Sequence, residues 1–227
     1  MLAGIFEQIQ RGLEAQIVSS IPRGFWEDIR GSAKQAYRDV YAEVKADPNV
    51  VDEQRLNKLH QDRHFRMENV FLSLAQKHNL DYSAALIERN KRTYVYVVTN
   101  SIGITQAYVK RIGDRPNPAR YRESLARVSA VPRLDLGDDP ISICMPKQFY
   151  GLITHNPLNH RKFDESSQQL AMMQLCIPTL DSKKWAYEFS IEEVLAMYPE
   201  TEKSIVSPNR KPTWKDRKSD SESSSAE

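Results

Sequence analysis

The sequence predicts an α+β fold, in which an N-terminal helical unit precedes a mixed region built on an antiparallel sheet. Two observations carry this prediction. In the first part of the chain, apolar side chains recur at spacings of three and four, the period of one helix face. From residue 93 onward, runs rich in β-branched and aromatic residues appear, which are typical of strands. We expect a helical unit over 1–85, an α+β region with an antiparallel sheet over 86–203 and a flexible polar tail over 204–227.

Three helices are expected in the first unit. One apolar stripe runs from Leu2 to Ile17 and a second from Trp26 to Val44, where Asp47 and Pro48 end the pattern. A third helix is expected from about Asp52 to His78. Asn79 follows it, and asparagine tolerates the left-handed conformation common just past a helix end.

A hairpin is expected to open the second region. Residues 93–99 and 102–109 are two strand-like runs separated by Asn100 and Ser101. We expect Asn100 or Gly103 to supply positive φ in the turn. Because both faces of the first strand are partly apolar, it is predicted to be central in the sheet.

Four further elements follow in order. A short basic helix is expected over 119–128, and two strands over 149–154 and 170–177, with a polar loop over 156–168 between the strands. The run from Ser190 to Glu193 matches a capping box, so a last short helix is expected there.

Composition excludes several classes of protein. The chain has 227 residues, of which 40% are apolar and 27% charged, so global disorder is excluded. No apolar run approaches the ~20 residues that cross a bilayer, and no signal peptide is visible. Cys144 and Cys176 form no CxxC motif and suit reduced thiols. We therefore expect a cytoplasmic protein without a membrane partner.

No motif of known chemistry is present. The phosphate-binding patterns GxxxxGK[ST] and GxGxxG and the hydrolase pattern GxSxG are absent. Nucleotide hydrolysis, dinucleotide redox chemistry and serine hydrolysis of the common kinds are therefore disfavoured. We predict a non-enzymatic protein with no catalytic residue, no metal site and no cofactor.

Two pairs of histidines are candidate functional residues. His60 and His64 have the i, i+4 spacing of a metal-binding helix, but the glutamate of the HExxH pattern is missing between them. Hydrogen bonding beside an apolar seam is the alternative interpretation. His155 and His160 are expected in a loop after a strand, where a divergent hydrolase could use them.

Charge is segregated along the chain although the total is nearly balanced, at 32 basic and 30 acidic residues. Residues 86–133 hold ten basic and three acidic side chains, whereas residues 134–202 hold five basic and 11 acidic. The basic segment predicts binding to a polyanion such as nucleic acid. The tyrosines of the first hairpin strand, Tyr94 and Tyr96, could stack on bases beside it. The residues predicted to contact nucleic acid are Arg89, Lys91, Arg92, Lys110, Arg111, Arg120, Arg122 and Arg127.

A second hypothesis explains the same charges. The basic and acidic segments could neutralise each other within the fold, in a homo-oligomer or against a partner protein, as an assembly or adaptor subunit would. The sequence leaves the choice between the two hypotheses open, and it does not distinguish DNA from RNA.

Overall fold

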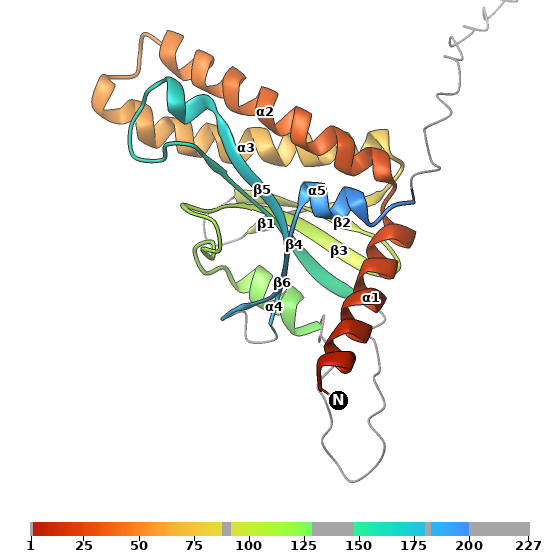
Figure 1. Cartoon of the computed structure of the whole chain (residues 1–227). Helices are drawn as coiled ribbons and strands as arrows, with labels where there is room; N and C mark the ends of the chain where they lie inside the picture. The colour runs from red at the N-terminus through yellow and green to blue at the C-terminus, as the bar shows by residue number, and fades with distance from the viewer. Residues whose placement is uncertain (1, 88–91, 129–147, 180–182, 200–227) are drawn as a thin grey trace, which may run out of the picture.

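A computed structural model of the chain describes residues 2–87, 92–128, 148–179 and 183–199 (Figure 1). The three predicted N-terminal helices are present as α1 (Leu2–Ser20), α2 (Arg23–Ala46) and α3 (Asp52–Lys77). Asn79 follows α3 with φ of 53°, so the expected left-handed residue is confirmed. The predicted tail, 204–227, lies outside the described residues.

The remaining elements build a six-stranded sheet in which the strands lie in chain order. The fold class is α+β, as predicted, and the sheet is mostly antiparallel. The exception is the pair β3 and β4, which run parallel in the register Ile102 to Phe149 through Tyr108 to His155. The strands are β1 (Asp81–Ile87), β2 (Arg92–Val98), β3 (Ile102–Tyr108), β4 (Phe149–Pro157), β5 (Leu170–Pro178) and β6 (Trp185–Ser190).

The described residues also form two short α-helices. The predicted basic helix is α4 (Arg120–Val128), in the crossover that a parallel connection requires between β3 and β4. The predicted capping box is also confirmed, because the Ser190 hydroxyl accepts from the Glu193 amide and the Glu193 carboxylate accepts from the Ser190 amide. This box begins α5 (Ile191–Ala196).

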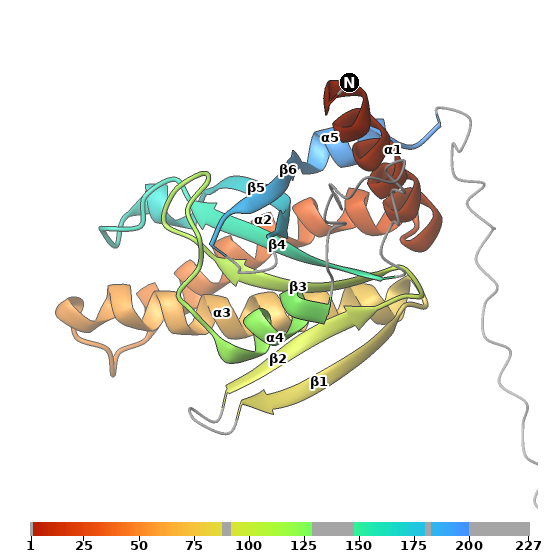
Figure 2. The same cartoon turned by 90° about the horizontal axis from the view of Figure 1, so that it is seen from below.

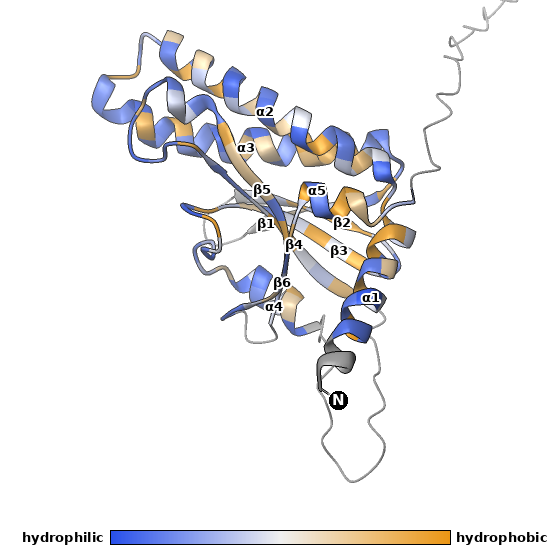
Figure 3. Ribbon diagram, in the orientation of Figure 1, coloured by the Kyte–Doolittle hydropathy of each residue, from blue (hydrophilic) through white to orange (hydrophobic). Residues whose placement is uncertain are grey.

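The sheet lies between two helical layers (Figures 1 and 2). On one face, side chains of α1, α2 and α3 pack with Val97, Ile104, Ile153 and Leu175 in a single buried apolar cluster. Alternate strand residues point to the opposite face. There Ala107, Tyr150 and Leu152 pack against Ala126 of α4 in a smaller cluster. Figure 3 shows the hydrophobic residues concentrated in the central strands and along the helix sides that face them.

The turn between β2 and β3 differs from the prediction. Neither Asn100 nor Gly103 has positive φ. The Thr99 side chain holds the turn instead, because its Oγ1 accepts from the Ile102 amide at 3.0 Å. Gly103 is needed for another reason: a Cβ there would collide with the hydroxyl and ring of Tyr96.

Three features of the sheet were not predicted. Strands β1 and β6 have no counterpart in the prediction, and β4 continues past residue 154 to Pro157. His155 therefore lies in a strand and is fully buried, whereas His160 lies in the loop that follows. No helix within the described ranges is long and apolar enough to span a bilayer.

Candidate functional site

The structure describes six of the eight predicted nucleic-acid contacts, in three groups. Arg89 and Lys91 lie outside the described residues, and Arg92 begins β2 opposite Ile87. Lys110 and Arg111 follow Val109, just beyond the end of β3, and are exposed. The third group, on α4, consists of Arg120, Arg122 and Arg127.

The α4 arginines differ in their surroundings. Arg120 and Arg127 are exposed, and Arg122 is half-buried. The Arg122 guanidinium donates to the Tyr121 hydroxyl at 2.9 Å and to the Asn117 carbonyl. These bonds fix Arg122 against the chain segment that precedes α4.

That segment, residues 109–119, is called the basic loop below. It leaves the sheet at the carboxyl end of β3, beside the carboxyl end of the parallel strand β4. The Val109 amide donates to the His155 carbonyl at 3.0 Å, which continues the pairing of the two strands. Because neighbouring parallel strands end at the same sheet edge, the loops after β3 and β4 lie together. Ligands of α/β sheets commonly bind outside such strand ends.

The first half of the basic loop lines a cavity of about 580 Å³, called the β3–β4 cavity. Lys110 and Arg111 lie on one side, and Arg161 comes from the loop after β4. Asp114 is the one acidic side chain among the described residues that line this cavity. His60 of α3 closes the cavity toward the helices. Its Nε2 lies 3.2 Å from the His160 carbonyl oxygen, which ties α3 to the loop after β4.

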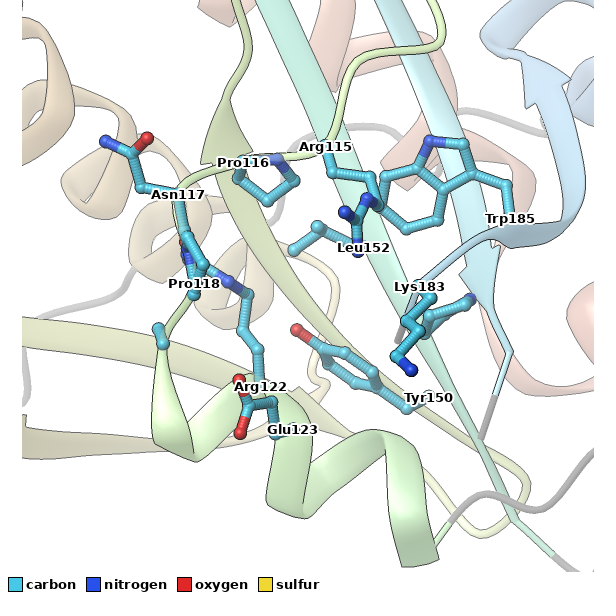
Figure 4. Close-up of a pocket in the computed structure, with 12 residues that line it drawn as sticks. Arg115, Pro116, Asn117, Pro118, Arg122, Glu123, Tyr150, Leu152, Lys183 and Trp185 are labelled. Atoms are coloured by element: carbon cyan, nitrogen blue, oxygen red, sulfur yellow. The ribbon is translucent and has the colours of Figure 1, made fainter. Parts of the chain in front are cut away.

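The second half of the loop lines another cavity, of about 410 Å³, called the α4–β6 cavity. Figure 4 shows Arg122 and Glu123 of α4 on one side, Trp185 and Lys183 on the other, and Tyr150 and Leu152 between them. Arg115 of the basic loop also lines this cavity. The loop thus separates two cavities and contributes cationic side chains to both.

Ion pairs are distributed unevenly over the molecule. On the helices, many basic side chains pair with nearby acids, as in Arg23 with Glu27 at 2.9 Å and Lys58 with Asp62 at 2.9 Å, but Lys34 and Arg38 of α2 form no ion pair with a described residue. Three exposed cations that line the β3–β4 cavity, Lys110, Arg111 and Arg161, form no ion pair with any described residue. Arg120 of α4 lines neither cavity and also forms no ion pair with a described residue.

Three of the described acids in residues 134–202 have roles elsewhere in the fold. Glu192 pairs with Arg30 of α2, and Glu193 completes the capping box of α5. Asp164 caps the short helix η1 (Glu165–Gln168), and hydrogen bonds to its carboxylate, chiefly from the Ser166 hydroxyl and then from the Ser166 and Ser167 amides, lower its pKa. None of these three carboxylates pairs with the basic loop.

A buried polar network lies beneath the site, on the face of the sheet that α2 and α3 cover. Glu68 of α3 accepts from the Val95 amide and from the Gln106 side-chain amide, both at 2.5 Å. Gln106 Oε1 lies 2.8 Å from His155 Nε2, and the Tyr37 hydroxyl lies 2.6 Å from His155 Nδ1. With Gln106 Oε1 accepting from Nε2–H, the Nδ1 atom accepts from the Tyr37 hydroxyl.

Burial controls protonation in this network. It raises the pKa of the Glu68 carboxyl to about 7, although the Val95 and Gln106 bonds oppose this shift. It lowers the pKa of His155 to about 3, so this imidazole is neutral at physiological pH. Perturbed carboxyls often mark functional sites. However, neither Glu68 nor His155 lines one of the two cavities, and their polar atoms are occupied by partners within the core.

Arg63 is the most unusual buried charge, at 1% exposure. Its Nη2 donates to the Ser167 carbonyl at 2.9 Å, and its guanidinium lies 4.2 Å from the centroid of the Tyr37 ring. Its Nε and Nη1 atoms have no hydrogen-bond partner among the described residues. Burial lowers the pKa of Arg63. The cation joins α2, α3 and η1 without reaching the surface.

The tyrosines that could have stacked on bases are engaged within the fold. Tyr94 stacks on Tyr121 of α4, with ring centroids 4.0 Å apart and planes 16° apart. Tyr96 packs against the cluster beneath α4. Helix α4 therefore covers the strand face where both tyrosines lie.

His60 and His64 of α3, and His78 just after this helix, face different partners. His60 contacts the His160 carbonyl, His64 Nδ1 lies 3.4 Å from Gln106 Nε2, and His78 Nε2 lies 2.7 Å from Asp28 Oδ2. Among the residues that the structure describes, no group of three or more His, Cys, Asp or Glu side chains could hold a metal ion.

The prediction missed part of the cationic surface. Arg161 follows β4 and Lys183 precedes β6, and both lie in a segment whose net charge is acidic. Arg115 belongs to the basic segment but is not among the predicted contacts. The Lys183-Lys184-Trp185 run is a local signal, although only the topology places it opposite α4.

Comparison of the chain with models of protein families, with curated proteins and with solved structures finds no significant match. The site is therefore interpreted from its own geometry.

Proposed function

We propose that the chain binds nucleic acid through a surface formed by the basic loop and by the cations that face it across the two cavities. The supporting observation is the convergence of exposed cations on one cavity. Lys110, Arg111 and Arg161 converge at the ends of two parallel strands and have no acidic partner among the described residues. Clustered cations without such partners gain most from a polyanion, because phosphate contacts release condensed counterions.

The competing hypothesis is that the basic and acidic segments pair with each other. Within the described residues no ion pair joins residues 86–133 to residues 134–202, and three acids of the second segment cap helices or pair with α2. Pairing between copies, or with another protein, is tested by the experiment below.

The test measures binding of the full chain to a fluorescein-labelled oligonucleotide by anisotropy over a salt titration. The logarithm of the affinity should fall linearly with the logarithm of salt concentration, with a slope of about 0.9 for each neutralised phosphate of a duplex or about 0.7 for each neutralised phosphate of a single strand. The double variant Lys110→Gln with Arg111→Gln should reduce that slope by about 2. Lys34→Gln with Arg38→Gln removes two exposed cations of α2 and serves as the charge-matched control.

Two results would contradict the proposal. One is no binding at low salt; the other is equal weakening in both double variants, since then only net charge would matter. A defined oligomer by light scattering that dissociates in the Lys110/Arg111 variant, without binding to the oligonucleotide, would favour assembly instead.

A further inference from the structure

The two cavities beside the basic loop differ in chemistry. The β3–β4 cavity is lined mainly by cationic and other polar side chains. The α4–β6 cavity adds an apolar and aromatic surface, made by Tyr150, Leu152, Pro178 and Trp185. Its volume of about 410 Å³ lies within the range of small-molecule sites, which are mostly apolar with a few placed polar groups.

The aromatic side chains of this cavity are held in place. Trp185 is partly exposed, and its Nε1 donates to the Gly113 carbonyl at 3.2 Å, so the indole is fixed by the basic loop. Tyr150 is buried, and its hydroxyl lies 2.5 Å from Thr105 Oγ1. A ring that enters the cavity therefore meets a surface that is already oriented, which lowers the entropy cost of binding.

The rim of the cavity carries charges of both signs. Arg115, Arg122 and Lys183 are cationic, whereas Glu123 contributes a carboxylate and Asn117 an amide (Figure 4). A bare phosphate suits the apolar floor poorly, and it would be repelled by Glu123. A flat heterocycle carrying an anionic group suits the cavity better, because its ring can lie on the floor while its anion meets the cations.

We propose that the α4–β6 cavity holds an unstacked base of single-stranded nucleic acid, with Trp185 as the stacking platform. This inference rests on the proposed function and names its substrate class. Stacking on aromatic side chains beside a cationic groove is how proteins hold single strands. A base within a duplex reaches such a pocket only after it leaves the stack, so duplexes bind more weakly there.

The order in which the basic loop lines the two cavities indicates the path of the nucleic-acid strand. Residues within 108–114 line the β3–β4 cavity, and residues 115–119 line the α4–β6 cavity. Phosphates lie against Lys110, Arg111 and Arg161, and the strand then delivers a base to Trp185. Asn117 and Glu123 offer hydrogen-bonding groups to the base edge, the usual mode of reading splayed bases.

The test compares a labelled single strand with the same strand annealed to its complement, using the full chain. Trp185→Ala should weaken single-strand binding by about 5- to 140-fold, the value of one base–aromatic stack. Trp185→Phe should retain most of the affinity. Phe65→Ala removes an exposed aromatic side chain of α3 outside the cavity and serves as the control.

A second measurement reports directly on the indole. In a Trp214→Phe background, Trp185 and the fully buried Trp26 are the remaining tryptophans. The single strand should quench the fluorescence of Trp185, and the further change Trp185→Phe should abolish the quenching.

The outcomes separate the two proposals. Salt-dependent binding that is unaltered by Trp185→Ala, equal for single strand and duplex and without quenching, would overturn this inference and leave the proposed function intact. Failure of the wild-type chain to bind either ligand at low salt would overturn both.

Discussion

The pH dependence of stability can test whether burial raises the pKa of the Glu68 carboxyl. The native structure encloses this side chain at 4% exposure between α3 and the sheet. Burial raises its pKa from 4.5 to about 7. Between these two values the native state holds a proton that the unfolded chain has released, so stability falls as pH rises.

The size of the effect follows from the two pKa values. Their difference corresponds to about 3 kcal/mol of unfolding free energy, since one pKa unit is about 1.4 kcal/mol. The contribution is complete below about pH 4.5 and is lost as pH rises through about 7. Most of this change, about 2–3 kcal/mol, falls between about pH 5 and about pH 8.

The perturbation is Glu68→Gln, which keeps the shape of the side chain and removes its titration. Urea unfolding followed by circular dichroism gives the free energy of unfolding for both proteins at each pH. The variant should become more stable relative to wild type by about 2–3 kcal/mol as pH rises over this interval. Altered hydrogen bonds in the variant would shift its free energy of unfolding by the same amount at every pH. They therefore do not affect the expected change with pH. Glu53→Gln, an exposed carboxyl in the first turn of α3, controls for the removal of a charge.

Wild type must be compared with the variant because the titration of His155 changes stability with pH in the direction opposite to that of Glu68. Its pKa is lowered from 6.5 to about 3, so its contribution is present above about pH 6.5 and is lost as pH falls toward 3. This contribution is common to both proteins and cancels in the difference. A difference that stays constant from about pH 5 to about pH 8 would show that Glu68 titrates normally and would refute the reasoning.

Two further substitutions test how the layers are joined. Gly103→Ala should destabilise the protein by about 1–3 kcal/mol, because its Cβ would displace Tyr96 from the packing under α4; an unchanged urea midpoint would contradict this. Tyr198→Phe should cost about 1–3 kcal/mol and shift the emission of Trp26, because the buried Trp26 Nε1–H, 2.9 Å from the Tyr198 hydroxyl, loses its acceptor. Unaltered emission and stability would show that this bond contributes nothing.

The parts of the fold that the sequence predicts are those with local signals. The helical stripes, the β2–β3 hairpin, Asn79 after α3 and the Ser190 capping box each depend on residues within a few positions of one another. Strand β1 is exposed over residues 81–84, so apolar alternation does not mark it. His155 and Asn156 have the composition of a loop. They lie in β4 because Tyr37 and Gln106, distant in sequence, provide hydrogen bonds to His155 within the core.

The residues of the candidate site likewise divide into those with a local sequence signal and those without one. Lys110, Arg111 and Arg122 could be predicted because they belong to one dense basic segment. Arg161 and Lys183 could not, because their relation to that segment arises from the parallel pairing of β3 with β4 and from the position of β6 opposite α4. In an all-antiparallel sheet, the loops after β3 and β4 would lie at opposite edges.

The topology also bears on the choice between the two interpretations of the charge segregation. The charge totals of sequence segments do not show which residues are close in space. Ion pairs form only between residues that are close in space. On the helices, pairs such as Arg23 with Glu27 form between residues four apart, and they form whatever the rest of the fold does. The cations around the basic loop come from three separate segments and converge only when β3 pairs with β4 and β6 lies opposite α4.

Folding thus gathers like charges at one sheet edge, an arrangement that costs free energy unless an anionic partner offsets it. Asp164, Glu192 and Glu193, which belong to the acidic segment, are committed to helix caps and to α2. These three carboxylates are held away from the basic loop, which is consistent with the proposal that an anion from outside the described fold offsets its charge.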